Sequence, residues 1–347
     1  MVASTWESNA AASPTADRGE PLISITDLHV EYLSPRGPVK AVDGVSFHIS
    51  PGEVVGLAGE SGSGKSTIAQ AILRILQPPA IITGGRVEFG GRDILSMTDA
   101  EIQEFRWRDV SMVFQSAMNA LNPVMTIGDQ ISDAIRAHNP MNKGEARRRA
   151  AEMLKIVGIE EARIDSYPHE LSGGMRQRAV IAIALVLNPP LMIMDEPTTA
   201  LDVVVQKEIM YQISELKRRL GFSILFITHD LSLLVEISDR IAIMYAGQIV
   251  EMAPARELFE TPLHPYTQGL MSSFPSLTGV RKRLEGIPGS PPDLVSPPSG
   301  CRFHPRCPKR FEPCDQLVPP LTEVRPQHHV ACHLFPEVRA KAVSSGR

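Results

Sequence analysis

Short apolar segments, separated by polar and glycine-rich ones, run through the first quarter of the chain. Four of them have the length and composition of strands, at Leu22–Ile25, His29–Tyr32, Val45–Ile49 and Glu53–Ala58. The last one leads directly into a glycine-rich loop. Apolar residues then recur near helical spacing until two prolines stop the helix: Ile68, Ile72, Ile75 and Leu76, followed by Pro78 and Pro79. The pattern predicts a strand, a glycine loop and a helix in succession.

The middle of the chain, from about Ala117 to Asn188, has a helical pattern. Its segment Gly144–Val157 carries the arginines Arg147–Arg149 on one side and apolar residues on another. This arrangement is typical of a solvated helix face rather than of a nucleic-acid patch. An alanine-rich helix is predicted after Gly174 and ends at Asn188, just before two prolines.

Two short apolar runs, Leu191–Met194 and Ser223–Ile227, follow the helical region, and each ends in a polar cluster. Their length and continuous apolar character predict parallel strands that are buried on both faces. Open α/β sheets bind ligands at the carboxyl ends of such strands. We therefore expect the chemistry of this chain at these two strand ends.

The composition changes beyond Glu260. Residues 288–300 contain too much proline, glycine and serine for regular structure, and the four cysteines all follow within residues 301–332. We therefore expect a separate C-terminal module that begins near there. At the other end, residues 1–20 are rich in alanine and serine and have no apolar core, which predicts a flexible tail and no secretory signal.

Charge and hydrophobicity argue against two classes of protein. The 347 residues are 43% hydrophobic, which is ordinary for a soluble protein of two or three domains. A net charge of -4 gives no electrostatic footprint for nucleic acid. The longest uninterrupted apolar run is Ala179–Leu187, whereas a membrane-spanning helix needs about 20 apolar residues. We expect cytoplasmic residence.

The glycine loop at Gly59–Thr67 fits the pattern G-x-x-x-x-G-K-[ST] of a phosphate-binding loop. Backbone amides of such a loop cradle the α- and β-phosphates of a nucleotide, the lysine Lys65 reaches the β- and γ-phosphates, and Ser66 ligates Mg²⁺. The other loop positions predicted to contact the nucleotide are Gly59, Ser61, Gly62, Ser63, Gly64 and Thr67.

Four further polar residues lie at the ends of predicted strands or in short polar clusters. Asp195 can hold Mg²⁺ through its water shell, and the adjacent Glu196 can orient and polarise an attacking water. A neutral imidazole at His229 could hydrogen-bond the γ-phosphate and the water. Gln115 offers an amide oxygen for Mg²⁺, although a single glutamine is weak evidence. The alternatives are carboxylates that cap a turn and a histidine with a structural role.

A second glycine turn, in Leu171–Arg178, opens the alanine-rich helix. Ser172, Gly173 and Gly174 can present bare backbone N–H groups to a phosphate. The chain therefore has two predicted phosphate-binding turns, although a single nucleotide site needs only one.

Taken in order, these motifs resemble the nucleotide-binding subunit of ATP-binding cassette (ABC) transporters. The matching stretches are Gly59–Thr67, Gln115, Leu171–Gln177, Leu191–Glu196, Ala200–Asp202 and His229. The resemblance covers residues 22 to about 335 and implies an α/β P-loop NTPase cassette with a RecA-like core, an antiparallel β-subdomain and a helical subdomain. It implies a nucleotide-binding domain at residues 21–258, a helical subdomain at about 117–188, and a C-terminal extension with a cysteine-rich metal site at 259–347.

The resemblance also implies a head-to-tail dimer, in which each ATP lies between the phosphate loop of one cassette and the glycine turn, or signature, of the other. Ser172 and Gly174 would then serve the nucleotide of a partner. Tyr32 matches the aromatic residue that stacks on adenine, with a packing residue as the alternative. Asp202 matches the loop that crosses the dimer interface, and Gln115 the loop that senses the membrane subunit.

Several stretches are similar to the ATPases of oligopeptide and dipeptide importers in particular: Met175–Arg178, Ala120–Pro123, Pro262–Thr267 and the cysteine tail. The implied activity is ATP hydrolysis that powers peptide import, by a peripheral subunit at the cytoplasmic face of the membrane. The implied partners are a second cassette in a heterodimer, two permease subunits and an extracytoplasmic substrate-binding protein. Nickel chelates, opines and oligosaccharides are alternative cargoes. A soluble cassette ATPase is disfavoured, because such proteins usually carry two cassettes or a coiled-coil insertion.

The four cysteines are flanked by histidines and lie in proline-rich loops. They are Cys301, Cys307, Cys314 and Cys332. Four thiolates can bind zinc or an iron–sulfur cluster, but the tight cysteine pairs usual in structural zinc sites are missing. Resemblance to peptide-importer ATPases implies a [4Fe-4S] cluster, with zinc or free thiols as alternatives. We expect a structural role, because bound metal can supply folding energy.

Overall fold

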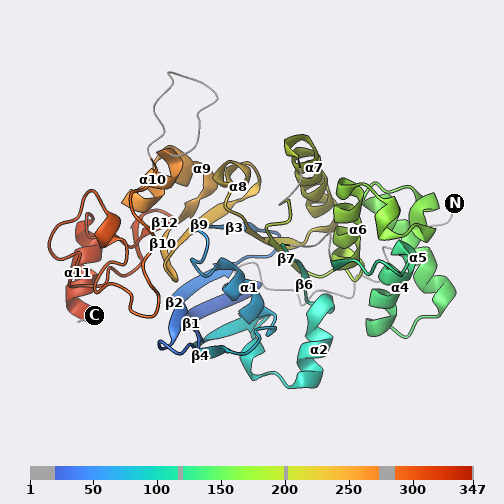
Figure 1. Cartoon of the computed structure of the whole chain (residues 1–347), viewed down its shortest axis with the longest axis horizontal. Coiled ribbons are helices and arrows are strands. Elements are labelled where there is room, and N and C mark those ends of the chain that lie inside the picture. The colour runs from blue at the N-terminus through green and yellow to red at the C-terminus, as the bar shows by residue number, and fades with distance from the viewer. Residues whose placement is uncertain (1–19, 116–119, 199–201, 273–285, 346–347) are drawn as a thin grey trace.

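The computed structural model describes residues 20–115, 120–198, 202–272 and 286–345, and Figure 1 shows their arrangement. Two sheets organise these residues. One has eight strands in the order β11-β12-β10-β9-β3-β8-β7-β6, and the other has four in the order β2-β1-β4-β5. The predicted flexible tail lies outside the described residues, apart from Glu20.

The four-stranded sheet is antiparallel and is formed by the N-terminal part of the chain. Its strands are β1 (Ile23–Tyr32), β2 (Val39–Ile49), β4 (Ala80–Phe89) and β5 (Arg92–Asp93). The pairing of β1 with β2 shifts register between Ile25 and Leu28, and both of these residues are buried. The shift therefore keeps apolar side chains on the buried face on both sides of it. That face shares an apolar cluster with Ile68 and Ile72 of the helix α1 (Lys65–Ile72).

Parallel strands form the centre of the eight-stranded sheet, and most are buried along their whole length. They are β3 (Val54–Ala58), β6 (Val110–Val113), β7 (Leu191–Asp195), β8 (Ser223–Ile227) and β9 (Arg240–Tyr245). Successive side chains enter different apolar clusters, as Met192 and Ile193 do. Burial on both faces explains why these strands are continuous apolar runs in the sequence.

Helices pack around the central sheet. They are α2 (Asp99–Arg108), α4 (Ile127–His138), α5 (Lys143–Ile156), α6 (Gly173–Leu185), α7 (Val203–Leu220) and α8 (Leu231–Ile237). Short 3-10 helices lie at Ile94–Ser96, Glu161–Asp165, Pro168–Glu170 and His304–Arg306. In Figure 1, α4, α5 and α6 gather at the right-hand end of the molecule. Arg147 on α5 pairs with Asp165 at 2.6 Å on the protein surface.

The C-terminal region continues the same eight-stranded sheet. Its elements are β10 (Gln248–Pro254), α9 (Ala255–Glu260), α10 (Pro265–Ser272), β11 (Thr322–Arg325), β12 (His328–Val330) and α11 (Pro336–Ser345). β12 pairs antiparallel with β10, and Phe303 belongs to the main apolar cluster. The prediction of a separate C-terminal module is therefore wrong. This proline-rich segment has few apolar residues of its own, and it is stabilised by packing on the cassette.

Two local predictions also differ from the structure. α1 ends at Ile72, well before the prolines, and Arg74 just beyond it has a positive φ of 48°. The two predicted strands Leu22–Ile25 and His29–Tyr32 are one strand, β1, because the irregular pairing between them continues the sheet.

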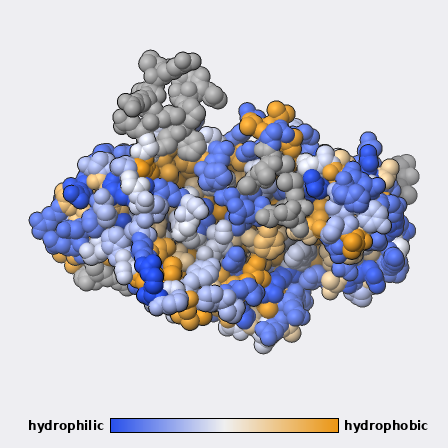
Figure 2. Space-filling model, viewed as in Figure 1, coloured by the Kyte–Doolittle hydropathy of each residue, from blue (hydrophilic) through white to orange (hydrophobic). Residues whose placement is uncertain are grey.

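No helix among the described residues is long and apolar enough to cross a membrane. In Figure 2 the visible face is largely hydrophilic, and apolar side chains form small separate patches. The visible surface therefore has no broad apolar band.

Candidate nucleotide-binding site

The glycine loop lies where β3 ends and α1 begins. Gly59 and Gly64 both have positive φ, and a Cβ on either would lie 2.2 Å from a backbone carbonyl oxygen, that of Met244 or Ala41 respectively. Gly62 also has a positive φ, but it faces open space. Close backbone packing thus shapes the two ends of the loop, while its middle is open to a ligand.

Lys65 is the first residue of α1, and its ammonium group closes the loop. Nζ donates to the carbonyl oxygens of Gly59 at 2.8 Å and Glu60 at 2.9 Å. Burial lowers the pKa of Lys65, although the carboxylates of Glu196 and Asp195 oppose this effect. The predicted phosphate-binding lysine is therefore buried and within electrostatic reach of both predicted acidic residues.

Asp195 ends β7, and its carboxylate hydrogen-bonds with the Ser66 side chain. Burial raises the pKa of Asp195, and the Ser66 hydrogen bond works against that rise. The Oδ1 atom is buried and has no hydrogen-bond partner among the residues that the structure describes. A buried carboxylate oxygen is costly unless a cation or water satisfies it, and Mg²⁺ prefers oxygen ligands. Asp195 and Ser66 thus fit the predicted Mg²⁺ site.

Side chains that follow three neighbouring strands meet at Glu196. Gln115 Nε2 donates to Glu196 Oε2 at 2.9 Å, and His229 Nδ1 lies 3.2 Å from Glu196 Oε1. The backbone N–H of Glu196 donates to the carbonyl of Ile227 at 2.8 Å, which ties it to the end of β8. The Gln115 nitrogen is used in this contact, so its amide oxygen is left for the predicted Mg²⁺ contact.

Tyr32 is the last residue of β1 and lies beside the start of α1. Its hydroxyl is 3.4 Å from Oγ1 of Thr67, and its side chain is half-buried. The predicted adenine-stacking residue therefore lies next to the helix that follows the phosphate loop. A ring in this place can meet a base whose phosphates occupy the loop.

The second glycine turn lies at the start of α6, away from the phosphate loop of the same chain. Ser172 is the N-cap of this helix and accepts the Met175 N–H at 3.3 Å. A Cβ on Gly174 would lie 2.9 Å from Val205 of α7, so a small residue is needed there. Figure 1 shows α6 to the right of the molecule and α1 near its centre. Ser172, Gly173 and Gly174 therefore do not complete the site around Lys65.

Asp202 caps α7 rather than contacting the phosphate loop. Its carboxylate accepts the N–H groups of Val204 at 3.1 Å and Val205 at 3.0 Å. The preceding residues of the predicted interface loop, Ala200 and Leu201, lie outside the described residues. Asp202 is exposed, at the start of the helix that packs against Gly174.

The four cysteines are free thiols in neighbouring loops of the C-terminal region. The N–H of Cys301 donates to the carbonyl of Cys314 at 2.8 Å. Burial raises the pKa of Cys301 and of Cys332 to about 12, and the nearby thiols add to both effects. Within the described part of the chain, no group of three or more His, Cys, Asp or Glu side chains is placed to hold a metal ion. The cysteine-rich metal site is therefore not supported by this arrangement.

Two residues at the site were not identifiable from the motifs. Arg306 pairs with Glu60, the second residue of the phosphate loop, with 2.8 Å between Nη1 and Oε2. Tyr266 accepts the backbone N–H of Glu60 at 3.0 Å. Tyr266 lies in the stretch Pro262–Thr267 that resembles peptide-importer ATPases, but nothing in that stretch indicates its partner.

The site thus combines a phosphate loop between β3 and α1, two carboxylates at the end of β7 and a histidine after β8. This combination defines a P-loop ATPase of the ATP-binding cassette class. Comparisons agree with this class. Residues 42–199 match the ABC transporter family, and residues 250–314 match the family described as oligopeptide/dipeptide transporter, C-terminal region.

Similar proteins cover almost the whole chain. The dipeptide transport ATP-binding protein DppD of Bacillus subtilis (strain 168) is 44% identical, over 94% of this chain and 98% of that protein. The oligopeptide transport ATP-binding protein OppD of Escherichia coli (strain K12) is 43% identical, over 93% of this chain and 96% of that protein. The chain belongs to this family of ABC transporter ATP-binding proteins, and it is an ATPase.

A solved structure supports the same fold. The ATP-binding cassette MJ0796, a dimer in a post-hydrolysis state bound to ADP and Pi, has a TM-score of 0.60 and 30% identity. The matched region covers 67% of this chain and 99% of the MJ0796 chain. The predicted ABC cassette fold is therefore confirmed.

Proposed function

We propose that this chain hydrolyses ATP to power the import of di- and oligopeptides through separate permease subunits. The proposal rests chiefly on the meeting of Gln115, Glu196 and His229 at the sheet edge that carries the phosphate loop. The peptide cargo is supported by the similarity to dipeptide and oligopeptide transport proteins over nearly the whole chain.

In the proposed reaction, a water attacks the γ-phosphorus, the bond to the β–γ bridging oxygen breaks, and ADP leaves. Glu196 orients this water and receives its proton, while His229 hydrogen-bonds the γ-phosphate. When ATP binds, the Lys65 ammonium group gives up its hydrogen bonds to the carbonyls of Gly59 and Glu60 and donates to phosphate oxygens instead. Ser66, Asp195 and Gln115 would hold Mg²⁺, which would offset negative charge on the phosphates. The remaining nucleotide contacts are assigned to Tyr32, Gly59, Ser61, Gly62, Ser63, Gly64 and Thr67.

The proposed active unit is a dimer with a second, related cassette. Ser172, Gly173 and Gly174 contact the partner's nucleotide, and Asp202 lies at the interface. This is supported by the separation of α6 from α1 and by Val203 and Val204, which begin α7 and are 68% and 76% exposed. Such exposed apolar side chains are suited to a subunit interface.

The other proposed partners are two permease subunits and an extracytoplasmic substrate-binding protein. Phe114, next to Gln115, is 40% exposed, which suits contact with a permease. The chain would then act as a peripheral subunit at the cytoplasmic face of the membrane. Residues 21–258 form the proposed nucleotide-binding domain, with a helical subdomain at about 117–188, and residues 259–347 form the extension.

The four cysteines are further proposed to hold a [4Fe-4S] cluster. The observation in its favour is that the cysteines lie in neighbouring loops, where the N–H of Cys301 donates to the carbonyl of Cys314 at 2.8 Å. A cluster is larger than a single zinc ion and bridges thiols that are further apart. Protein purified without oxygen should be brown and contain about four irons. Colourless protein with stoichiometric zinc would overturn this assignment.

The role of Glu196 is tested by Glu196→Gln. This variant should bind a fluorescent ATP analogue and dimerise with its partner, but release phosphate at least about a hundredfold more slowly than wild type, because the base is lost. Glu104→Gln, an exposed glutamate on α2, is the matched control and should hydrolyse ATP normally. Turnover by Glu196→Gln at the wild-type rate would remove Glu196 as the catalytic carboxylate.

The cargo is tested with the intact complex in vesicles. Transport of a labelled dipeptide should depend on ATP, and unlabelled oligopeptides should compete with it. Nickel chelates, opines and oligosaccharides should not compete. Uptake of one of these compounds, without peptide uptake, would assign the ATPase to another importer.

A further inference from the structure

The loop between Cys301 and Cys307 reaches the phosphate loop through Arg306. Its guanidinium forms a fork on the Glu60 carboxylate, with 2.8 Å between Nη1 and Oε2 and 3.0 Å between Nη2 and Oε1. The Arg306 side chain is 7% exposed, and that of Glu60 is 25% exposed. Paired charge-assisted hydrogen bonds of this kind are strong and fix geometry. They join the C-terminal region to the phosphate loop.

The backbone of Glu60 is held by the C-terminal region as well. Its N–H donates to the hydroxyl of Tyr266 at 3.0 Å, and Tyr266 is fully buried. Arg306 also donates to the hydroxyl of Tyr245 at 3.3 Å, and the two tyrosine rings pack with centroids 4.6 Å apart. Groups outside the phosphate loop therefore fix both the side chain and the main chain of Glu60.

Glu60 in turn supports the part of the loop that faces a nucleotide. Its carbonyl accepts from Lys65 Nζ at 2.9 Å and from the Ser63 N–H at 3.2 Å. Its carboxylate belongs to a loop built to receive phosphates, and an unpaired negative charge there would repel ATP. Arg306 supplies the positive charge that balances this carboxylate.

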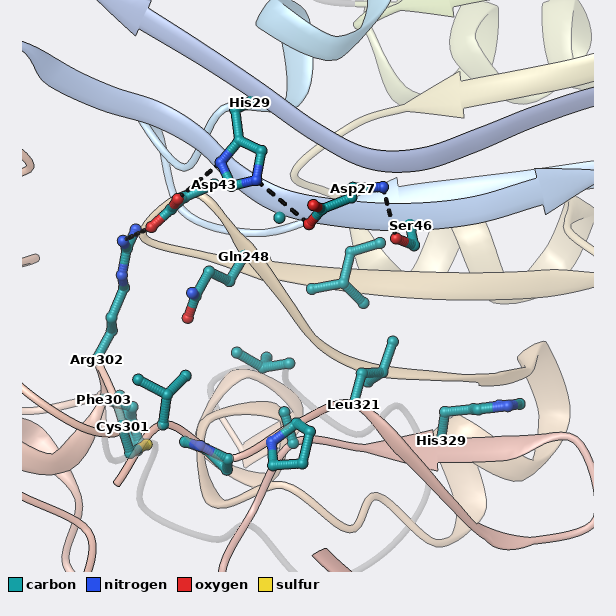
Figure 3. A pocket seen from close by; sticks show the side chains of 17 residues that line it. Asp27, His29, Asp43, Ser46, Gln248, Cys301, Arg302, Phe303, Leu321 and His329 are labelled. Atoms are coloured by element: carbon teal, nitrogen blue, oxygen red, sulfur yellow. Dashed lines mark hydrogen bonds and ion pairs between the residues drawn. The ribbon is translucent and has the colours of Figure 1, made fainter. Parts of the chain in front are cut away.

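The same loop has a second attachment, through Arg302. Its guanidinium donates to the carbonyl of Ala246 and to the carboxylate of Asp43. Figure 3 shows Asp43 between Arg302 and His29, and Asp43 Oδ1 lies 3.0 Å from His29 Nδ1. The N–H of Gly247, the residue after Ala246, donates to the Ser63 carbonyl at 3.0 Å. The loop between Cys301 and Cys307 therefore reaches the phosphate loop through two arginines. Arg306 does so through Glu60, and Arg302 does so through the turn at Gly247.

We propose that Arg306 is a positioning residue for nucleotide binding. It neutralises the Glu60 carboxylate within the phosphate loop, so the loop between Cys301 and Cys307 contributes to the affinity for nucleotide. Arg306 can have this role only if the proposed nucleotide site around Lys65 is correct.

The test is titration of the full-length chain with a fluorescent ATP analogue. Arg306→Gln should weaken binding about tenfold, because it leaves the Glu60 carboxylate unbalanced, and the loss should shrink at high salt. Arg306→Lys keeps the charge but not the fork, so it should have an intermediate affinity. Arg310→Gln is the matched control, because Arg310 is exposed and has no contact with the phosphate loop among the described residues.

The double variant Glu60→Gln/Arg306→Gln separates charge balance from general support of the fold. Removing both charges should return the affinity to within about twofold of wild type, because no unpaired carboxylate remains. Glu60→Gln alone should bind ATP at least as tightly as wild type, which keeps the test informative if Arg306→Gln fails to fold. The proposal is overturned if Arg306→Gln binds normally, if the double variant binds as weakly as Arg306→Gln, or if Glu60→Gln alone weakens binding.

Lys65→Ala distinguishes failure of this proposal from failure of the nucleotide site itself. It should weaken binding strongly, since Lys65 is the predicted phosphate ligand. If Lys65→Ala binds like wild type, the nucleotide site is misplaced. If only the Arg306 variants bind like wild type, the site stands and the role of Arg306 is refuted.

Discussion

Glu251 and His328 form a buried ion pair that fixes the C-terminal strands to the central sheet. Both side chains are fully buried, and His328 Nε2 lies 2.7 Å from Glu251 Oε1. Glu251 also accepts the backbone N–H groups of Leu263 at 2.6 Å and His264 at 2.9 Å. One carboxylate on β10 thus satisfies donors from two other segments of the extension.

Replacing Glu251 should therefore be strongly destabilising. Glu251→Ala leaves three buried donors without their acceptor, and removing one partner of a buried pair costs about 3–5 kcal/mol. For a chain of this length, such a loss should lower the midpoint of thermal unfolding by about 5 °C. Glu260→Ala is the matched control, since this exposed glutamate pairs with Arg256 at the surface and should contribute less than about 1 kcal/mol.

The same pair predicts a pH dependence of definite sign. Burial alone would lower the pKa of His328, but the hydrogen bonds that its ring donates to the Glu251 and Glu257 carboxylates outweigh this effect and leave the pKa raised. The stabilisation from the charged His328 is therefore fully present below the unfolded-state pKa, about 6.5. It is lost as the pH rises through the higher folded-state pKa.

The assay is thermal unfolding of wild type and His328→Gln from about pH 6 to about pH 9. The difference between their midpoints isolates the contribution of His328, and it should be largest at the acidic end and shrink as the pH rises. His329→Gln, at the half-buried neighbour on β12, is the control and should follow the wild-type profile. A difference that stays constant or grows with pH would refute the assignment of a charged His328.

Two further predictions concern the nucleotide site. Gly64→Ala should abolish binding of a fluorescent ATP analogue, because its Cβ would lie 2.2 Å from the Ala41 carbonyl oxygen. Gly62→Ala faces open space and should weaken binding by no more than about tenfold; equal affinities for these two variants would contradict the reasoning. Ser172→Arg should leave the ATP affinity of the isolated chain unchanged but reduce phosphate release by the assembled transporter, because this turn is proposed to contact the partner's nucleotide. If Ser172→Arg weakens the ATP affinity of the isolated chain, Ser172 contacts the chain's own nucleotide and the reasoning is refuted.

The local parts of the site can be predicted from the sequence, because they depend on residues that are close together in the chain. The spacing of Gly59, Gly64 and Lys65 is sufficient to define a phosphate loop. β8 begins and ends at the predicted residues, Ser223 and Ile227. Burial on both faces favours apolar residues along such a strand, and all residues of β8 after Ser223 are apolar.

Contacts between distant segments cannot be predicted in this way. Glu251 lies in a mostly apolar strand, and nothing near it indicates that His328 and two backbone amides satisfy its charge. Arg306 and Glu60 are 246 residues apart, and neither belongs to a motif that specifies the other. Composition marks the proline-rich region as different from the cassette, but it does not encode the pairing of β12 with β10. This is why the expectation of a separate C-terminal module is wrong.

The strand order explains how residues far apart in the sequence form one candidate catalytic group. β7 lies between β6 and β8, and Met194 pairs with Val113 while Asp195 pairs with Ile227. Parallel neighbours end at the same edge, so the residues that follow them become neighbours too. Glu196 is the central one, and it receives donors from Gln115 on one side and His229 on the other. These two contacts orient the Glu196 carboxylate at the edge of the sheet that carries the phosphate loop.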